Sequence, residues 1–321
     1  MMRMKETHVD IAIPVYHPDD NFADVIRKLE FQDIRPCRII LIHTVDEGAA
    51  DLEDLTSEFE NVEIHTIKKE DFDHGKTRNK AASYSDAPYL IFMTMDAIPA
   101  DPHLVSNLLK PMAEKNVAVS YARQLPKEGC AALEKINRSF NYPDSDIKKG
   151  KEDLERLGVK TFFCSNACAC YNREVFDLLG GFVDETIFNE DMIYASKAVK
   201  AGYYIYYTAK ACVYHSHNYS LSEQYHRNFD LGVSQAEHPE VFEGISSESE
   251  GMKLVRKTIL SLAREKKLYL LPGFILFCAA RYLGFRKGKR FDKMSRKAVL
   301  KMTANPDYFL KKWSMTDPVR N

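Results

Sequence analysis

Short apolar segments alternate with amphipathic segments through the first 125 residues of the chain. Helical spacing follows the apolar segments at about 21–32 and 49–59, from about 76, and after Asp101. Near-continuous apolar strands separated by helices favour a mostly parallel sheet with helices on both faces. We therefore predict an α/β fold, with strands at 9–16, 37–44, 62–67, 88–96 and 117–124.

The pattern changes in the second half of the chain. A long apolar run covers 160–173, and a helix is predicted over 189–202 with Asn189 as its cap. Strand-like sequence follows at 203–217, and from about residue 250 the chain becomes mostly helical and basic. We predict a main domain over 1–250 and a helical extension over 251–321.

The composition is that of an ordinary soluble protein, with 45% hydrophobic and 28% charged residues among 321. The N-terminus lacks an apolar leader, so no signal peptide is expected. No segment has about 18 uninterrupted apolar residues, so no spanning helix is expected. Seven cysteines without disulfide-like spacing suit a reducing cytoplasm.

Three of the cysteines lie close together in the long apolar run. Cys164, Cys168 and Cys170 invite a zinc interpretation, because thiolates are common zinc ligands. They share strand parity, however, so they can also pack one face of a strand as small apolar residues. We favour packing.

Charge is distributed unevenly along the chain. Residues 251–321 carry 18 Lys and Arg against 4 Asp and Glu, whereas the rest of the chain is acidic. An apolar run at 268–285 contains Pro272, Gly273 and Arg281 and has basic residues on both sides. This pattern predicts contact with an anionic membrane surface, with a helical hairpin packed on the main domain as the alternative. The extension has no RNA-binding signature, so nucleic acid is not an expected partner.

Two acidic residues follow predicted strands directly. Asp46 and Asp96 each lie where a strand leaves the sheet, and ligands bind at the carboxyl ends of parallel strands. Asp96 suits Mg²⁺ or Mn²⁺ as a hard oxygen ligand. It can equally be a loop acid bonded to nearby backbone amides.

The segment FDHGKTRNKA (72–81) opens a predicted helix. Gly75 permits close approach, and Lys76, Arg78 and Asn79 lie in the first turns. Helix N-termini and basic donors suit a phosphate or nucleobase, although a solvated helix start has the same composition.

Two further segments contain candidate proton acceptors or ligands. In FNEDMIYA, Glu190 and Asp191 either complement the helix dipole or supply a general base. In YHSHNYS, His215 and His217 share strand parity and can bind a metal or phosphate, or serve structural roles.

Taken in order, these segments resemble family 2 glycosyltransferases of the GT-A fold, and in particular the bacterial rhamnosyltransferase branch. The resemblance covers residues 9 to about 293. Its motifs are FDHGKTRN, FMTMDAIPAD, ARQLP, FNYP, KTFFCSNACACYNREVF, GGF, NEDM, AGY, VYHSHNYS and RYLGFRKGKRFDK.

The resemblance implies roles for the acidic and histidine candidates. Asp96 is similar to the second acid of the family's Asp-x-Asp metal site, with Thr94 in place of the first. The expected metal is Mg²⁺ or Mn²⁺, held by Asp96 and His215. Asp191 resembles the catalytic base.

Other positions are implied to bind the donor or the acceptor. The nucleotide contacts implied by the family are Asp46, His74, Arg78, Asn79 and Asp96, and the sugar and acceptor contacts are Ser165, Asn166, Glu190 and His217.

The implied function is that of an inverting glycosyltransferase with a GT-A catalytic domain over 1–250. The expected donor is dTDP-L-rhamnose and the acceptor a glycan or lipid-linked glycan of the cell surface. The expected location is the cytoplasm, at the inner face of the membrane. A UDP-hexose donor and a non-catalytic nucleotide-sugar-binding protein remain the alternatives.

Overall fold

The computed structural model describes residues 8–19, 21–49, 51–243 and 248–316. It divides into two compact units. The first comprises 1–130, 141–184 and 190–216, and the second comprises 131–140, 185–189 and 217–321. The predicted functional division after residue 250 stays a prediction.

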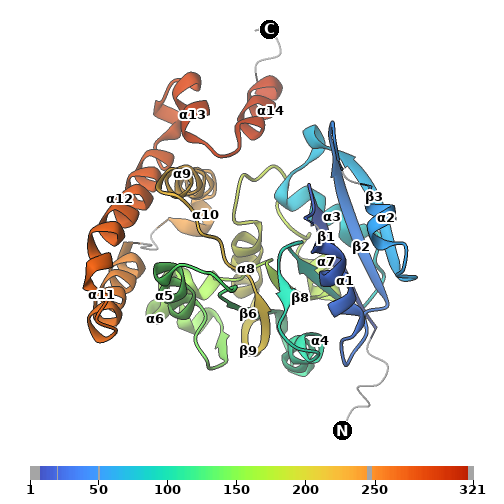
Figure 1. Cartoon of the computed structure of the whole chain (residues 1–321). Helices are drawn as coiled ribbons and strands as arrows, with labels where there is room; N and C mark the ends of the chain where they lie inside the picture. The colour runs from blue at the N-terminus through green and yellow to red at the C-terminus, as the bar shows by residue number, and fades with distance from the viewer. Residues whose placement is uncertain (1–7, 20, 50, 244–247, 317–321) are drawn as a thin grey trace. The chain divides into compact units, whose positions relative to one another are not determined.

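A mixed, mostly parallel sheet forms the centre of the first unit (Figure 1). Its strands pair in the order β3-β2-β1-β4-β8-β6-β9-β5, with β7 paired to β9. The pairs β1–β2, β2–β3, β1–β4 and β6–β9 are parallel. The predicted α/β sheet is therefore confirmed, with strands β1 (Val9–Val15), β2 (Arg38–Val45), β3 (Val62–Lys68), β4 (Tyr89–Met93), β5 (Ile98–Pro99), β6 (Val117–Leu125), β7 (Ile147–Lys149), β8 (Cys168–Asn172) and β9 (Tyr204–Tyr214).

Helices cover both faces of this sheet. Neighbouring residues of a strand point to opposite faces, so one strand contributes side chains to two separate cores. Ile91 of β4 packs in one core with Leu29 and Leu108. The next residue, Phe92, lies on the other face, where its ring is 5.9 Å from that of Phe176. The helices of this unit are α1 (Phe22–Glu30), α2 (Leu52–Thr56), α3 (His74–Ser83), α4 (Leu104–Leu109), α6 (Leu154–Leu157), α7 (Arg173–Leu178) and α8 (Glu190–Lys200).

The long apolar run at 160–173 ends in the antiparallel strand β8. This strand lies between β4 and β6, and Cys168 pairs with Met93. Just beyond that pair, the N–H of Thr94 donates to the Ala167 carbonyl at 3.3 Å. The antiparallel direction therefore brings the start of β8 to the end of β4, where Asp96 lies.

Two predicted helix starts need correction. Asp101 accepts the N–H of His103 at 2.8 Å, and the helix predicted after Asp101, α4, begins only at Leu104. Asn189 precedes α8 as expected, but its φ is 67° and its amide nitrogen donates to the hydroxyl of Ser234 at 3.0 Å. For Asn189, the contact with Ser234 takes the place of the local helix cap.

The second unit is helical. Its two long helices α9 and α12 approach closely at glycines: a Cβ at Gly288 would lie 2.0 Å from the Phe229 carbonyl oxygen, and one at Gly284 would lie 2.3 Å from that of Tyr225. A small core around Phe229 and Phe309 joins α9 to α13 and α14. The helices of this unit are α5 (Ala132–Asn141), α9 (Leu221–Glu237), α10 (Pro239–Phe242), α11 (Glu248–Arg264), α12 (Leu271–Gly288), α13 (Arg296–Met302) and α14 (Pro306–Thr316).

One side of α12 is apolar and exposed. Ile275, Leu276 and Leu283 are 58%, 57% and 52% exposed. Their spacing is that of a single helix face. Arg281 is half-buried, and burial lowers its pKa. The arginine that interrupts the apolar run in the sequence therefore does not interrupt the exposed face.

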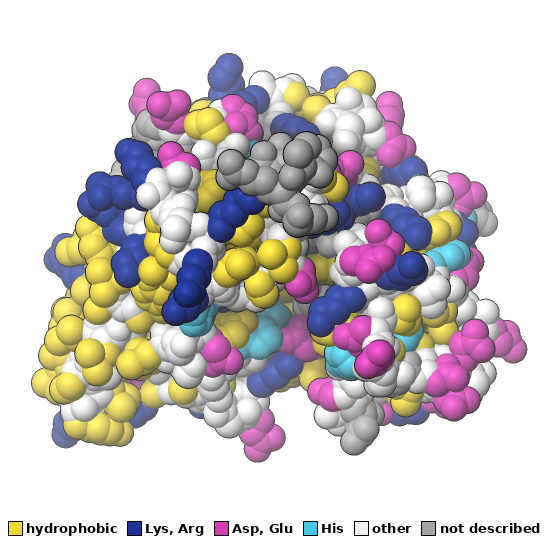
Figure 2. All heavy atoms as spheres, turned by 90° about the horizontal axis from the view of Figure 1, so that it is seen from above, with side chains coloured by type: hydrophobic (Ala, Val, Ile, Leu, Met, Phe, Trp, Pro, Cys, Tyr) yellow, Lys and Arg dark blue, Asp and Glu magenta, His cyan; other side chains and the backbone are white. Residues whose placement is uncertain are grey.

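By length and composition alone, the segment Leu268–Gly288 is long and apolar enough to cross a membrane, judged within the described residues. The expectation that the chain has no such segment is thus not confirmed. Figure 2 shows hydrophobic side chains gathered at the left of that view, with Lys and Arg beside them.

Candidate active site

Asp96 lies just past the end of β4 with two positively charged or chargeable neighbours. Its Oδ1 is 3.5 Å from Nε2 of His215, and its Oδ2 is 3.7 Å from Nζ of Lys127. These side-chain contacts suit the predicted ligand role of Asp96, which stays a prediction. Lys127 had no predicted role, because a single lysine in a loop carries no sequence signal.

A β-bulge directs His215 toward Asp96. The register between β6 and β9 shifts after Ala122, whose partner is Thr208, so that Arg123 pairs with Cys212. Beyond this point, the N–H of His215 donates to the Leu125 carbonyl at 2.9 Å. Bulges commonly re-aim side chains beside functional sites.

Gln124 connects His215 to the start of β8. Its Oε1 is 2.8 Å from Nδ1 of His215, and its Nε2 donates to Oγ of Ser165 at 2.8 Å. The side chain is buried between them. Gln124 belongs to the ARQLP motif, but its contacts with His215 and Ser165 exist only in the folded protein and leave no signal in the sequence.

Asp191 lies in the first turn of α8 and accepts two backbone hydrogen bonds. The N–H of Asn166 donates to Oδ2 at 3.0 Å, and the N–H of Met192 donates to Oδ1 at 2.7 Å. Burial raises the pKa of Asp191 to about 7, and the negative charge of Glu190 adds to this effect. A carboxyl group with such a pKa exchanges protons near neutral pH.

Glu190 belongs to a buried network beside Asp191. Its Oε1 accepts the side-chain amide of Asn166 at 3.0 Å and lies 3.2 Å from the guanidinium of Arg78. The hydroxyl of Tyr171 donates to the side-chain oxygen of Asn166 at 2.7 Å. Burial opposes ionisation of Glu190, but the charge of Arg78 keeps its pKa below the ordinary value.

The basic segment 72–81 forms α3, which is capped by Asp73. The carboxylate of Asp73 accepts the N–H groups of Gly75 and Lys76 at 2.9 and 2.8 Å. A Cβ at Gly75 would lie 1.8 Å from the Val183 carbonyl oxygen, so only glycine fits there. The tight approach predicted at Gly75 is thus to the protein's own backbone.

Asn79 holds the glycine-containing loop that follows α7. Its amide donates to the carbonyl of Phe182 at 2.9 Å and to Asp184 at 3.0 Å, and its oxygen accepts the N–H of Phe182 at 2.9 Å. Arg78, which is also buried, donates to the His74 carbonyl at 2.9 Å and pairs with Glu190. Both side chains thus have structural contacts that compete with the predicted nucleotide contacts.

Asp46 lies at the end of β2 among groups that favour its charged form. The hydroxyl of Tyr16 donates to its Oδ2 at 2.7 Å, and His17 and Lys69 lie 3.0 and 3.5 Å away. The hydrogen bond from Tyr16 is the main cause that lowers the pKa of Asp46. Tyr16, His17 and Lys69 carry no signal in the sequence, because they follow β1 and β3 and meet Asp46 only when the ends of these strands come together beside the end of β2.

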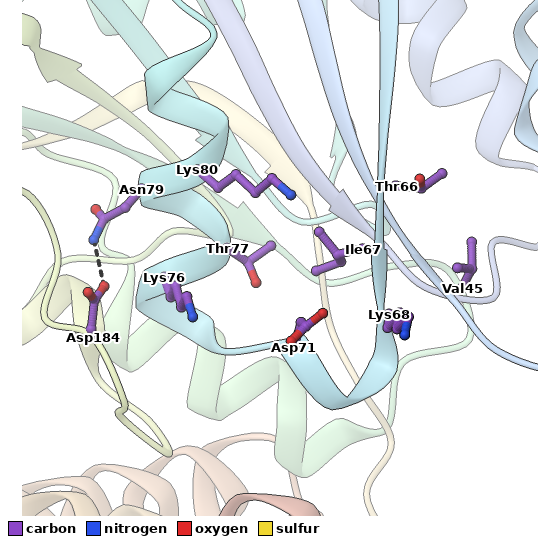
Figure 3. A pocket seen from close by; sticks show the side chains of 10 residues that line it. All are labelled: Val45, Thr66, Ile67, Lys68, Asp71, Lys76, Thr77, Asn79, Lys80 and Asp184. Carbon is purple, nitrogen blue, oxygen red and sulfur yellow. Dashed lines mark hydrogen bonds between the residues drawn. The ribbon is translucent and has the colours of Figure 1, made fainter. Parts of the chain in front are cut away.

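A hollow of about 560 Å³ lies between α3 and the edge strand β3 (Figure 3). Three lysines line it, Lys68, Lys76 and Lys80, together with two acidic residues, Asp71 and Asp184. Figure 3 shows the Asn79–Asp184 hydrogen bond at its margin. One wall of the hollow belongs to the segment 72–81, which was predicted to bind a phosphate or a nucleobase.

Comparison with known proteins shows the family of this chain. Residues 10–180 match the family described as glycosyl transferase family 2. The chain belongs to this family. The glycosyltransferase is 37% identical over 291 residues to the O-antigen chain rhamnosyltransferase RfbN of Salmonella typhimurium, a match that covers 89% of this chain and 91% of that protein. It is 36% identical over 289 residues to WbaN of Salmonella anatum, also an O-antigen chain rhamnosyltransferase, with 88% and 90% covered.

Solved structures confirm the GT-A type of fold for this glycosyltransferase. The mannosyltransferase PcManGT of Pyrobaculum calidifontis, in complex with GDP-Man and Mn²⁺, matches with a TM-score of 0.54 and 12% identity over 98% of this chain and 88% of its own. TarS of S. aureus (residues 1–349, with UDP-GlcNAc) matches with a TM-score of 0.51 and 11% identity over 88% and 92%. At these identities the likeness concerns the fold.

The first unit of the glycosyltransferase brings several predicted residues together. A series of contacts runs from Asp96 through His215, Gln124 and Ser165 to the segment that binds Asp191. His217 belongs to the second unit, where its ring stacks on Tyr219 at 5.0 Å. The individual roles of these residues stay predictions.

The residues around Asp96 fit a divalent cation. Its carboxylate oxygen and the imidazole nitrogen of His215 are a hard and an intermediate ligand, 3.5 Å apart. Thr94, which the resemblance predicts in place of the first acid, has a buried hydroxyl without a hydrogen-bond partner among the described residues. Both features suit a site that is completed by an ion and the substrate's oxygens.

Proposed function

We propose that this glycosyltransferase transfers L-rhamnose from dTDP-L-rhamnose, with inversion, to a glycan or lipid-linked glycan during cell-surface polysaccharide synthesis. Two relatives that match about nine-tenths of the chain are O-antigen chain rhamnosyltransferases, which supports this donor and this acceptor class. The observation that carries the catalytic assignment is the position of Asp191. Its carboxylate has a pKa raised to about 7 and is bonded to the backbone of the Asn166 segment.

Asp191 acts as the general base. Its ionised carboxylate takes the proton from an acceptor hydroxyl, which attacks the anomeric carbon from the side opposite the diphosphate. One displacement inverts the configuration, and no covalent sugar–enzyme intermediate is needed. The two backbone N–H groups that bind Asp191 hold its carboxylate in place for this step.

The diphosphate lies near Asp96 in this proposal. Asp96 and His215 hold Mg²⁺ or Mn²⁺, which would neutralise charge on the departing diphosphate. The mannosyltransferase of similar fold is known with Mn²⁺, which supports the choice of ion. Lys127, 3.7 Å from Asp96, adds a positive charge from the protein itself.

The nucleoside lies near Asp46. The carboxylate of Asp46 offers hydrogen-bond acceptors to a nucleobase. Tyr16 and Lys69 beside it offer an aromatic ring and a positive charge. Arg78 and Asn79 are assigned to support of the site instead, because their polar groups bind Glu190 and the 182–184 loop. His74 remains a predicted nucleotide contact, and Ser165, Asn166, Glu190 and His217 remain predicted contacts or supports for sugar and acceptor.

The exposed apolar face of α12 contacts the cytoplasmic membrane surface. Large apolar side chains on this face are exposed, and basic residues flank the helix at both ends, including Lys266, Lys267, Arg286 and Lys287. Apolar insertion combined with positive charge suits an anionic leaflet, where each basic residue adds about 1 kcal/mol. Such contact would bring the enzyme to the membrane that holds a lipid-linked acceptor.

A donor screen tests the function. The protein is incubated with dTDP-L-rhamnose, UDP-hexoses and GDP-mannose, with Mg²⁺ or Mn²⁺ and a lipid-linked glycan, and the released nucleoside diphosphate is measured. Release of dTDP above the other diphosphates is expected. Preferential release of UDP would replace rhamnose with a hexose, and binding of a donor without any release would favour the non-catalytic alternative.

A further inference from the structure

The side-chain amide of Gln124 is buried in the first unit between His215 and Ser165. The residue lies near the end of β6, directly after the bulge, and its side chain is only 3% exposed. A buried amide must have its donor and acceptor groups satisfied, because a lost hydrogen bond there is costly. Its partners are His215 on one side and Ser165 on the other.

The orientation of this amide determines which nitrogen of His215 carries the proton. Oε1 of Gln124 faces Nδ1 of the imidazole at 2.8 Å. An amide oxygen can only accept a hydrogen bond, so Nδ1 must be the protonated nitrogen. In the neutral ring, Nε2 then has a lone pair that lies 3.5 Å from the carboxylate of Asp96.

A lone pair and a carboxylate oxygen at this distance are two acceptors that face one another. They are compatible when a cation, either a proton or a metal ion, lies between them. The opposite amide orientation would place the Gln124 N–H against Nδ1. The imidazole proton would then lie on Nε2 and point at Asp96, which would block the ligand position.

Ser165 tolerates either orientation, because a hydroxyl both donates and accepts. As it stands, its Oγ accepts the amide of Gln124 at 2.8 Å and lies 3.4 Å from the N–H of Ala167. The same side chain that orients His215 therefore also anchors the segment whose next residue, Asn166, binds Asp191.

We propose that Gln124 is a positioning residue: it holds His215 in the Nδ1–H tautomer, with Nε2 presented as a metal ligand, and links this ligand to the segment that carries Ser165. This inference rests on the metal role proposed for His215. Partners in the outer shell of a metal ligand commonly change metal affinity by about 10–100-fold.

The first test is the tautomer itself, measured without metal. Nitrogen-15 spectra of histidine-labelled protein are recorded at a pH of about 8.5, where an ordinary imidazole is neutral. His215 is assigned by its loss in His215→Gln. We expect the Nδ1–H form in the unaltered protein and in Gln124→Glu, whose carboxylate still accepts from Nδ1. Gln124→Met should shift the ring toward the Nε2–H form, because it removes the acceptor at Nδ1 while Asp96 still faces Nε2.

The second test is Mn²⁺ affinity, measured by electron paramagnetic resonance in the presence of dTDP. Gln124→Met should bind Mn²⁺ about tenfold or more weakly. Gln124→Glu should not lose affinity. Thermal unfolding confirms that each variant is folded.

The outcomes separate this inference from the proposed function. A folded Gln124→Met protein that keeps the Nδ1–H form, or that binds Mn²⁺ like the unaltered protein, would overturn the inference. If the unaltered protein binds no Mn²⁺ in the presence of dTDP, both the proposed metal site and the role of His215 as a metal ligand are refuted. A different preferred donor would change the proposed function without affecting either measurement on Gln124.

Discussion

The backbone N–H of Asn166 donates to the carboxylate of Asp191 at 3.0 Å. This bond joins a residue just before β8 to the first turn of α8, two elements that lie far apart in the sequence. The side chain of Asn166 binds the neighbouring Glu190, so both acids of the NEDM motif depend on one residue. The proposed base is thus positioned by the segment that is predicted to line the acceptor site.

Asp191→Asn tests the proposed base. The amide keeps an oxygen that can accept the Asn166 N–H, but it cannot take a proton, so transfer should fall by about 10²–10⁴-fold. Donor binding, measured by calorimetry, should remain close to that of the unaltered protein. Loss of donor binding together with transfer would reassign Asp191 to the nucleotide-sugar site.

The pH dependence of transfer should report the same carboxyl group. Its pKa is raised to about 7, and the base form is the carboxylate, so kcat/KM should rise as the pH increases through about 7. In Glu190→Gln the midpoint should move lower, because a neighbouring negative charge is removed. An unchanged midpoint in this variant would argue against Asp191 as the titrating group.

The same shift affects stability in the opposite direction. A carboxyl group whose pKa is raised by folding binds its proton more tightly in the native state than in the unfolded chain. Its stabilising contribution is complete below the ordinary value of 3.8 and is lost as the pH rises through about 7. Unfolding of Asp191→Asn should therefore depend less on pH in this interval than unfolding of the unaltered protein.

Removal of divalent metal should stop transfer, and Mn²⁺ or Mg²⁺ should restore it. Asp96→Ala should weaken Mn²⁺ binding, because it removes the carboxylate ligand. Lys127→Met is a useful comparison, since it removes only a nearby positive charge and should not weaken Mn²⁺ binding. Full activity after complete chelation would refute the metal-dependent mechanism.

Gly75→Ala should destabilise the first unit. The new Cβ would lie 1.8 Å from the Val183 carbonyl oxygen, and overpacking of this kind costs about 1–3 kcal/mol or more. Gly251→Ala in α11 is the matched control, because no heavy atom lies within 4 Å and alanine favours a helix by about 0.5–1 kcal/mol. Denaturant unfolding should give opposite signs for the two changes, and equal stability of both variants would contradict the structure near Gly75.

Membrane contact can be tested on the exposed face of α12. Replacing Ile275, Leu276 and Leu283 together by serine should strongly reduce sedimentation with phosphatidylglycerol vesicles, because apolar side chains no longer enter the interface. The control variant replaces Phe31 and Leu178, which are 73% and 70% exposed in the first unit. The control should bind vesicles normally, and binding of the protein should weaken at high salt. Unchanged sedimentation of the triple variant would exclude this face as the contact.

Much of the fold and several site candidates were predictable from the sequence. The strands around Ile11, Ile40 and Ile91 are nearly continuous apolar runs because both faces of a central parallel strand are buried, and this leaves a clear pattern. The motifs around Asp96 and Asp191 carried the family resemblance. Such signals are local, since they depend on a few consecutive residues.

The sequence by itself determined the alternating strands and helices, the family and the pair of acids proposed for metal binding and catalysis. Only the tertiary structure decided that Arg78 and Asn79 support Glu190 and the 182–184 loop, and that Gln124 lies between His215 and Ser165. It also decided that Arg281 is half-buried while large apolar side chains of α12 are exposed. The physical reason is that a polar side chain has several possible hydrogen-bond partners, and the partner it receives depends on which distant segments the packed sheet brings within about 3 Å.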